Sequence, residues 1–194
     1  MGPCGSTSGV AAPGKISAHK SVDDLTDYDT FFPAGQTNSL LSKFLTKERW
    51  EKFKDESDAS NVSFKTCVFS GIKNLDSGIG LYAGSHDSYS KWAEIFDDVI
   101  LEYHKGYTKE VGHVSNMTSE GLTNGEFNEE DGAMINSTRI RVGRNLAGFP
   151  LGPGVTKEDR DTIMAKVVAA AETFEGDLAG KFYPLEGMDA KVSR

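Results

Sequence analysis

Hydrophobic spacing predicts helices in the first half of the chain. Around residues 40–53, Thr46 is placed as an N-cap, and the apolar residues after it, Trp50 and Phe53, face inward. Over residues 87–103, apolar and aromatic residues recur every three or four positions on one face, namely Tyr89, Trp92, Phe96, Val99, Ile100 and Tyr103. We expect both faces to lie in a hydrophobic core.

A third helix is predicted from Thr156, where Asp159 completes a capping-box pattern. Its apolar stripe, also expected to be buried, consists of Ile163, Val167, Ala171 and Phe174. Before it, the polar residues 108–132 are rich in Gly, Asn and Glu and predict a linker. The predicted organisation is a disordered tail over 1–29, a small helical domain over 30–107, and a second domain over 133–194.

Residues 137–141, Ser-Thr-Arg-Ile-Arg, predict a β-strand with an unusual face. Because side chains alternate along a strand, Ser137, Arg139 and Arg141 share one side, while Thr138 and Ile140 share the other. Guanidinium groups two residues apart, about 6–7 Å, suit a polyphosphate. The alternative is a solvated strand face whose arginines pair with nearby acids.

The amino-acid composition restricts the kinds of partner that this chain can bind. A net charge of −8 argues against nonspecific nucleic-acid binding, so any anion site must be local. The two cysteines, Cys4 and Cys67, suit a reducing compartment, and we expect Cys67 to be buried. Gly2 and Cys4 fit a myristoylation and palmitoylation pattern, which would anchor the chain to a membrane. The alternative is an unmodified tail, and Pro3 after Gly2 favours it.

Two segments carry a family resemblance. Residues 135–145, Ile-Asn-Ser-Thr-Arg-Ile-Arg-Val-Gly-Arg-Asn, resemble the nucleotide-pocket strand of the phosphagen (guanidino) kinases, the arginine and creatine kinase family. Residues 74–83, Asn-Leu-Asp-Ser-Gly-Ile-Gly-Leu-Tyr-Ala, resemble the specificity loop of arginine kinases. The resemblance runs almost continuously over residues 37–188.

The resemblance implies an α+β protein, in which a small all-α N-terminal domain precedes the start of a mixed α/β catalytic domain with an antiparallel sheet. It implies reversible phosphoryl transfer from Mg²⁺-bound ATP to a guanidino substrate, with L-arginine favoured and taurocyamine or lombricine as alternatives. The implied ATP-phosphate contacts lie in the segment Ser137, Thr138, Arg139, Ile140 and Arg141. The implied substrate contacts are Gly78, Ile79, Gly80 and Tyr82, and Asp76 would latch the loop on domain closure.

The chain ends at Arg194, whereas phosphagen kinases continue for nearly the same length again. In the family, that part carries further arginines, two glutamates and a reactive cysteine, so we expect no catalytic residue here. We expect a cytoplasmic kinase fragment that is inactive alone. The alternative is a shortened, non-catalytic relative that binds a guanidino compound, a nucleotide or another kinase chain.

Overall fold

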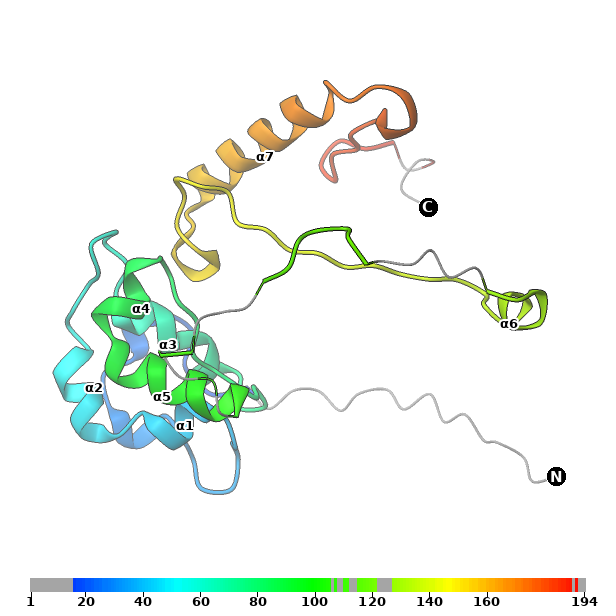
Figure 1. The fold of residues 1–194 in the computed structure, drawn as a ribbon. Helices are drawn as coiled ribbons and strands as arrows, with labels where there is room; N and C mark the ends of the chain where they lie inside the picture. The colour runs from blue at the N-terminus through cyan, green and yellow to red at the C-terminus, as the bar shows by residue number, and fades with distance from the viewer. Residues whose placement is uncertain are drawn as a thin grey trace.

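The computed structural model describes residues 16–105, 107, 110–111, 115–121, 127–189 and 191. Within them the regular structure is helical, and Figure 1 shows α1 to α5 gathered together with α6 and α7 apart from them. The α-helices are α1 Leu40–Phe44, α2 Lys47–Phe53, α3 Phe64–Lys73, α4 Asp87–Lys91, α5 Ala93–His104, α6 Glu129–Ala133 and α7 Lys157–Ala171. The short 3-10 turns are η1 Val22–Asp24, η2 Tyr28–Thr30, η3 Gly152–Gly154 and η4 Gly176–Leu178.

Hydroxyl side chains start several helices. The side-chain oxygens of Ser39, Thr46, Ser63 and Thr156 each accept a hydrogen bond from the third backbone N–H of α1, α2, α3 and α7. Such caps satisfy donors that have no partner within the helix. The predicted caps at Thr46 and Thr156 are confirmed, and the Thr156–Asp159 capping box is complete.

An aromatic cluster forms the centre of the core. The Phe64 ring on α3 lies 5.2 Å from that of Trp92, and the Trp50 ring on α2 lies 4.7 Å from that of Phe31. All four of these side chains are fully buried. Cys67 is likewise buried, as predicted, so α3 runs through the middle of the core.

The core differs from the predicted helices in two places. Helix α3 was not predicted, and the single helix expected over 87–103 is two helices, α4 and α5, separated at Trp92 (φ −117°, ψ 39°). The ends of the predicted stripe are not buried, since Tyr89 on α4 and Tyr103 in the last turn of α5 are 45% and 57% exposed. The centre of the stripe is buried as expected.

Part of the predicted disordered tail belongs to this core. The Ser17 N–H donates to the Lys73 carbonyl over 2.8 Å, and Leu25 is fully buried. The boundary expected at residue 29 is therefore wrong for residues 16–29, because an apolar side chain in this stretch fills the core. Residues 1–15, with Gly2 and Cys4, lie outside the described residues.

The described residues after α6 contain neither the predicted strand nor an antiparallel sheet. A strand is defined by its ladder to a neighbour, and residues 137–141 have no such neighbour in the described chain. They form an extended trace (Figure 1), on which Ile140 is 90% exposed. The α7 stripe is not buried either, with Val167 and Phe174 about half exposed.

Candidate functional site

The loop of residues 74–83 begins where α3 ends. The Asn74 N–H and its Nδ2 both donate to the Ser70 carbonyl over 2.9 Å, which closes the helix. The Ser77 N–H then donates to the Asn74 carbonyl over 3.0 Å, forming a tight turn. The chain therefore reverses at Leu75 and Asp76 and returns across α3.

Hydrogen bonds fix the returning backbone on two sides. The Gly78 carbonyl accepts from the Leu40 N–H over 3.0 Å, and the Ile79 carbonyl accepts from the Leu41 N–H over 2.8 Å. On the other side, the Tyr82 N–H donates to the Cys67 carbonyl of α3 over 2.9 Å. The loop thus spans from the first turn of α1 to the middle of α3.

Two glycines allow this close approach. A Cβ on Gly71 of α3 would overlap the carbonyl oxygen of Gly80, so only glycine fits there. Gly80 is buried and has φ +80°, a conformation that other residues rarely adopt. A larger side chain at either position would move the backbone of the loop.

The loop leaves backbone donors without partners. The N–H groups of Gly78, Ile79 and Gly80 donate to no acceptor in the described part of the chain. Most backbone N–H groups removed from water are paired, and Gly80 is buried while Gly78 is exposed, so the Gly80 donor in particular suits an acceptor from outside the chain. A carboxylate is the acceptor that suits adjacent N–H groups.

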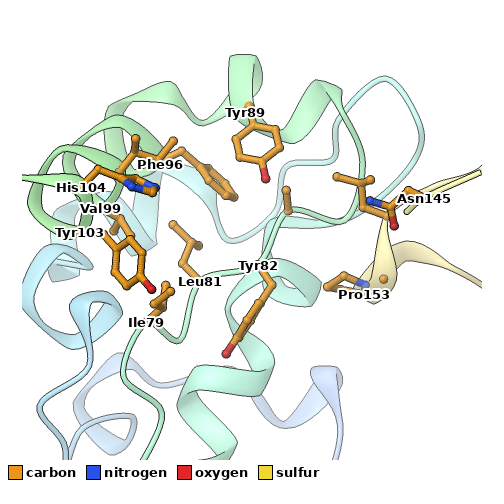
Figure 2. A pocket seen from close by; sticks show the side chains of 14 residues that line it. Ile79, Leu81, Tyr82, Tyr89, Phe96, Val99, Tyr103, His104, Asn145 and Pro153 are labelled. Carbon is orange, nitrogen blue, oxygen red and sulfur yellow. The ribbon is translucent and has the colours of Figure 1, made fainter. Parts of the chain in front are cut away.

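A pocket of about 440 Å³ lies beside the loop. Figure 2 shows α5 residues on one side, Asn145 and Pro153 on the other, and Leu81 and Tyr82 between them. The walls are mainly apolar and aromatic: Ile79, Leu81, Tyr82, Ala83, Tyr89, Phe96, Val99, Ile100, Tyr103, His104, Asn145, Leu151, Gly152 and Pro153. Of the loop residues in this wall, Tyr82 is 40% exposed.

Several of these wall residues were not predicted as site residues. Tyr89 and Tyr103 fit the helical stripe and were expected in the core. Asn145 ends the 135–145 motif but was given no role, and no motif marked Leu151. The sequence held no signal for this wall, because the stripe over residues 87–103 has the width of an ordinary core-facing helix face.

The turn at residues 151–154 docks on the helical core. The Leu151 N–H donates to the Gly84 carbonyl over 2.9 Å, and the Leu151 side chain is 9% exposed. The approach is close, since a Cβ on Gly154 would overlap the Gly84 carbonyl and lie 2.8 Å from Cγ2 of Val62. This contact joins the second half of the chain to the wall of the pocket.

A buried carboxylate holds the segment that carries Gly84. Asp58, 6% exposed, accepts from the hydroxyls of Ser85 (2.6 Å) and Ser88 (2.7 Å) and from the N–H groups of Val62 and Ser60 (both 3.0 Å). Burial raises the pKa of Asp58, but these hydrogen bonds outweigh it and the pKa is lowered. Asp58 is therefore a charged structural anchor behind the pocket.

The neighbouring Cys67 is a free thiol. Its Sγ lies 3.8 Å from the Ser88 hydroxyl, and burial raises the pKa of this thiol. A raised pKa keeps the sulfur protonated and unreactive at neutral pH, so its role is packing.

The predicted phosphate-binding residues lie apart from this pocket. Ser137, Thr138, Arg139, Ile140 and Arg141 are all exposed, and none of them lines the pocket wall. Neither arginine pairs with an acid in the described residues, so the alternative of a self-paired strand face has no support there. Within the described residues, both guanidinium groups are thus without an acidic partner.

Asp76 is exposed and forms no ion pair within the described part of the chain. The residues that the structure describes include no group of three His, Cys, Asp or Glu side chains able to hold a metal ion. Nor do they include a helix of the length and apolarity that a membrane span needs.

Residues 35–101, which comprise α1 to most of α5 and the loop, match the family described as ATP:guanido phosphotransferase, N-terminal domain. The chain belongs to this phosphagen kinase family. The match begins after the 16–34 segment, although Leu25 and Phe31 of that segment are fully buried in the same core. The family domain in this chain therefore packs with residues that precede the matched range.

Relatives in the family are arginine kinases. The arginine kinase of Anthopleura japonica is 42% identical over 154 residues, covering 79% of this chain and 21% of the relative. The arginine kinase Lit v 2.0101 of Penaeus vannamei is 36% identical over 162 residues, covering 83% of this chain and 45% of the relative. The chain thus spans less than half the length of these relatives.

Solved structures agree with the fold. A duplicated taurocyamine kinase from Schistosoma mansoni, with bound transition state analog components, has a TM-score of 0.70 at 28% identity, covering 84% of this chain and 23% of that one. A lombricine kinase has a TM-score of 0.69 at 24% identity, and the match covers 85% of this chain and 45% of the lombricine kinase chain. These phosphagen kinases share the arrangement of the helical domain.

Proposed function

We propose that the loop of residues 78–82 binds the acid group of a guanidino substrate, with the carboxylate of L-arginine favoured over taurocyamine or lombricine. The observation that carries this proposal is the set of N–H groups at Gly78, Ile79 and Gly80 that have no acceptor among the described residues, on a backbone held from two sides. The Tyr82 hydroxyl supplies a further directional donor. The names of the arginine kinases that this chain resembles support arginine.

We also propose that Ser137, Thr138, Arg139, Ile140 and Arg141 form the ATP-phosphate segment. The chemistry of the donors fits, because guanidinium forks and hydroxyls bind phosphate oxygens, and both arginines are free of described acids. Mg²⁺, in this proposal, is held chiefly by the nucleotide phosphates. When bound, the metal and the arginines both offset phosphate charge.

In the whole protein these residues serve a phosphoryl transfer between ATP and a guanidino nitrogen. The loop orients the acceptor and the arginines orient the phosphates, so the contribution of this chain is positioning and charge stabilisation. Asp76 latches the loop on closure, when residues 30–107 and 133–194 approach about the 108–132 linker. We place the protein in the cytoplasm, and assign no catalytic residue to this chain.

One observation favours a second candidate, a non-catalytic module that pairs with another kinase chain. Ile140 and Val142 are 90% and 79% exposed on an extended segment, and such a segment offers its backbone to a partner strand. A partner would be detected as a stoichiometric complex with a separately produced arginine kinase.

Equilibrium dialysis tests the guanidino-acid site. The purified chain is expected to bind L-arginine, and Tyr82→Phe is expected to weaken binding by about 3- to 10-fold, the value of one hydrogen bond. Tyr183→Phe, an exposed tyrosine outside the pocket, is the matched control. Equal affinity of both variants for arginine would show that the Tyr82 hydroxyl does not contribute to arginine binding.

Nucleotide binding is tested in the same way. Arg139→Ala and Arg141→Ala should each weaken Mg²⁺-ATP binding about 10-fold, as expected for a charged hydrogen bond. Arg160→Ala on α7 removes an exposed arginine as control. A coupled ADP-release assay with both ligands should show no turnover by this chain, and turnover would refute the expectation that it is inactive alone.

A further inference from the structure

Two successive peptide units of the loop point the same way. The carbonyls of Gly78 and Ile79 both turn toward α1, where they accept from the Leu40 and Leu41 N–H groups over 3.0 and 2.8 Å. All described peptide bonds are trans, and in a trans peptide the carbonyl and the following N–H point in opposite directions. The N–H groups of Ile79 and Gly80 therefore both point away from α1.

The donors of α1 are fully used in this arrangement. Its first three N–H groups have no partner inside the helix: Leu40 donates to Gly78, Leu41 donates to Ile79, and Ser42 donates to the Ser39 hydroxyl over 3.1 Å. Ser39 is 1% exposed, so water does not replace these bonds easily. The first turn of α1 thus acts as a fixed support for the loop.

We infer that the first turn of α1 and Gly71 of α3 together orient the Ile79 and Gly80 N–H groups as a donor pair for the substrate carboxylate. The identity of the ligand in this inference rests on the proposed function, whereas the directions of the N–H groups do not. Leu40 acts through its main-chain N–H, and Gly71 acts through the space that it leaves for the Cα and carbonyl of Gly80. Both are positioning residues that do not contact the ligand.

The chain offers a variant that removes one of these bonds selectively. Leu40 is the first residue of α1, where proline is well tolerated, and Ser39 has ψ 151°, which a following proline allows. Leu40→Pro therefore deletes the N–H that binds Gly78 and leaves the helix start intact. Leu40→Ala removes the same partly buried side chain but keeps the N–H, and is the reference.

The first readout needs no ligand. Residual dipolar couplings of ¹⁵N-labelled protein report the directions of the Ile79 and Gly80 N–H bonds. We expect Leu40→Ala to keep the directions of the unaltered protein and Leu40→Pro to change or average them. Identical couplings in the two variants would overturn the inference.

The second readout is the dissociation constant for L-arginine. Leu40→Pro should bind about 3- to 10-fold more weakly than Leu40→Ala, the effect of losing one backbone hydrogen bond. Agmatine lacks the carboxylate, so its dissociation constant should be the same for the two variants. A general loss of structure would instead weaken the binding of both ligands. If the unaltered chain fails to bind arginine, the proposed function fails, and the couplings still decide the geometry.

Gly71→Ala provides an independent variant should Leu40→Pro not fold. The added Cβ would lie 2.5 Å from the Gly80 Cα and must displace it, and because this Cα also carries the Gly80 nitrogen, the Gly80 N–H direction should change even though alanine favours a helix. Gly180→Ala is the control, because a Cβ there meets nothing within 4 Å. An unchanged residual dipolar coupling of the Gly80 N–H bond in Gly71→Ala would contradict the positioning role of Gly71.

Discussion

The loop after α3 and the arginine segment after α6 both carry family motifs, but the structure supports them very differently. Gly78 to Tyr82 are held by the first turn of α1 and by α3, and the core beneath them is aromatic and buried. Arg139 and Arg141 stand on an extended trace whose neighbours Ile140 and Val142 are almost fully exposed. One motif is oriented within the described chain, and the other is not.

The difference shows that a motif identifies chemistry but does not by itself orient it. The loop donors are directed by residues about 40 positions earlier, through two hydrogen bonds that no local pattern contains. The arginines have the residue types for phosphate, yet their relative positions depend on a strand partner. The following predictions test this contrast, in order of decreasing effect.

The largest contrast is between two phenylalanines. Phe64→Ala should lower the free energy of unfolding by about 3–5 kcal/mol, because the side chain is fully buried among Trp50, Phe53 and Trp92. Phe174→Ala, at a side chain that is 51% exposed, should cost less than about 1 kcal/mol. Urea unfolding followed by tryptophan fluorescence measures both, and comparable losses would refute the contrast.

The second effect concerns Asp58. Asp58→Asn should cost roughly 2–4 kcal/mol near pH 7, because a buried carboxylate loses charged hydrogen bonds. Since its folded pKa lies below the ordinary 3.8, its contribution is present above 3.8 and is lost as the pH falls through the folded value.

The difference in unfolding free energy between the unaltered chain and Asp58→Asn isolates this group from other carboxylates. It should shrink as the pH is lowered below 3.8. Asp55→Asn, at an exposed position nearby, is the matched control. A difference that stays constant at low pH would contradict the charged anchor.

A smaller effect is expected where the two regions meet. Gly154→Ala should undock the Leu151 turn, because the new Cβ overlaps the Gly84 carbonyl, whereas Gly152→Ala meets nothing within 4 Å. Hydrogen exchange at the Leu151 amide, bonded to Gly84 over 2.9 Å, should accelerate about 10-fold or more only in Gly154→Ala. Equal rates would mean that the turn is not held by this approach.

The smallest effect is local to α7. Thr156→Ala removes the side-chain cap and should reduce α7 helix stability by about 1 kcal/mol, while Thr156→Ser retains it. The Cα chemical shifts of residues 157–171 should move toward random-coil values in the alanine variant alone. The unfolding midpoint of the aromatic core should not change, since α7 contributes no residue to that core.

Local signals predicted α2 and α7, because Thr46 and Thr156 are helix caps that can be recognised in the sequence. Helix α3 was missed, although Ser63 is a cap, because its short apolar run also fits a buried segment of another kind. The break at Trp92 depends on how α4 and α5 pack, so periodicity gave one helix in place of two.

The candidate site was predicted in part. The glycines and Tyr82 were identified from their motif, but the orientation of the loop N–H groups follows from contacts with α1 and α3. Tyr89, Tyr103 and the Leu151 turn were missed because their place in the pocket wall is set by tertiary packing.

The central claim is that the loop presents its N–H groups to a carboxylate. The direct test is a titration of the ¹⁵N-labelled chain with L-arginine, monitored at the amides of Gly78, Ile79 and Gly80. We predict saturable shifts of these three signals with L-arginine, and none with agmatine at the same concentration. Equal shifts with both ligands, or no shifts with L-arginine, would contradict the claim.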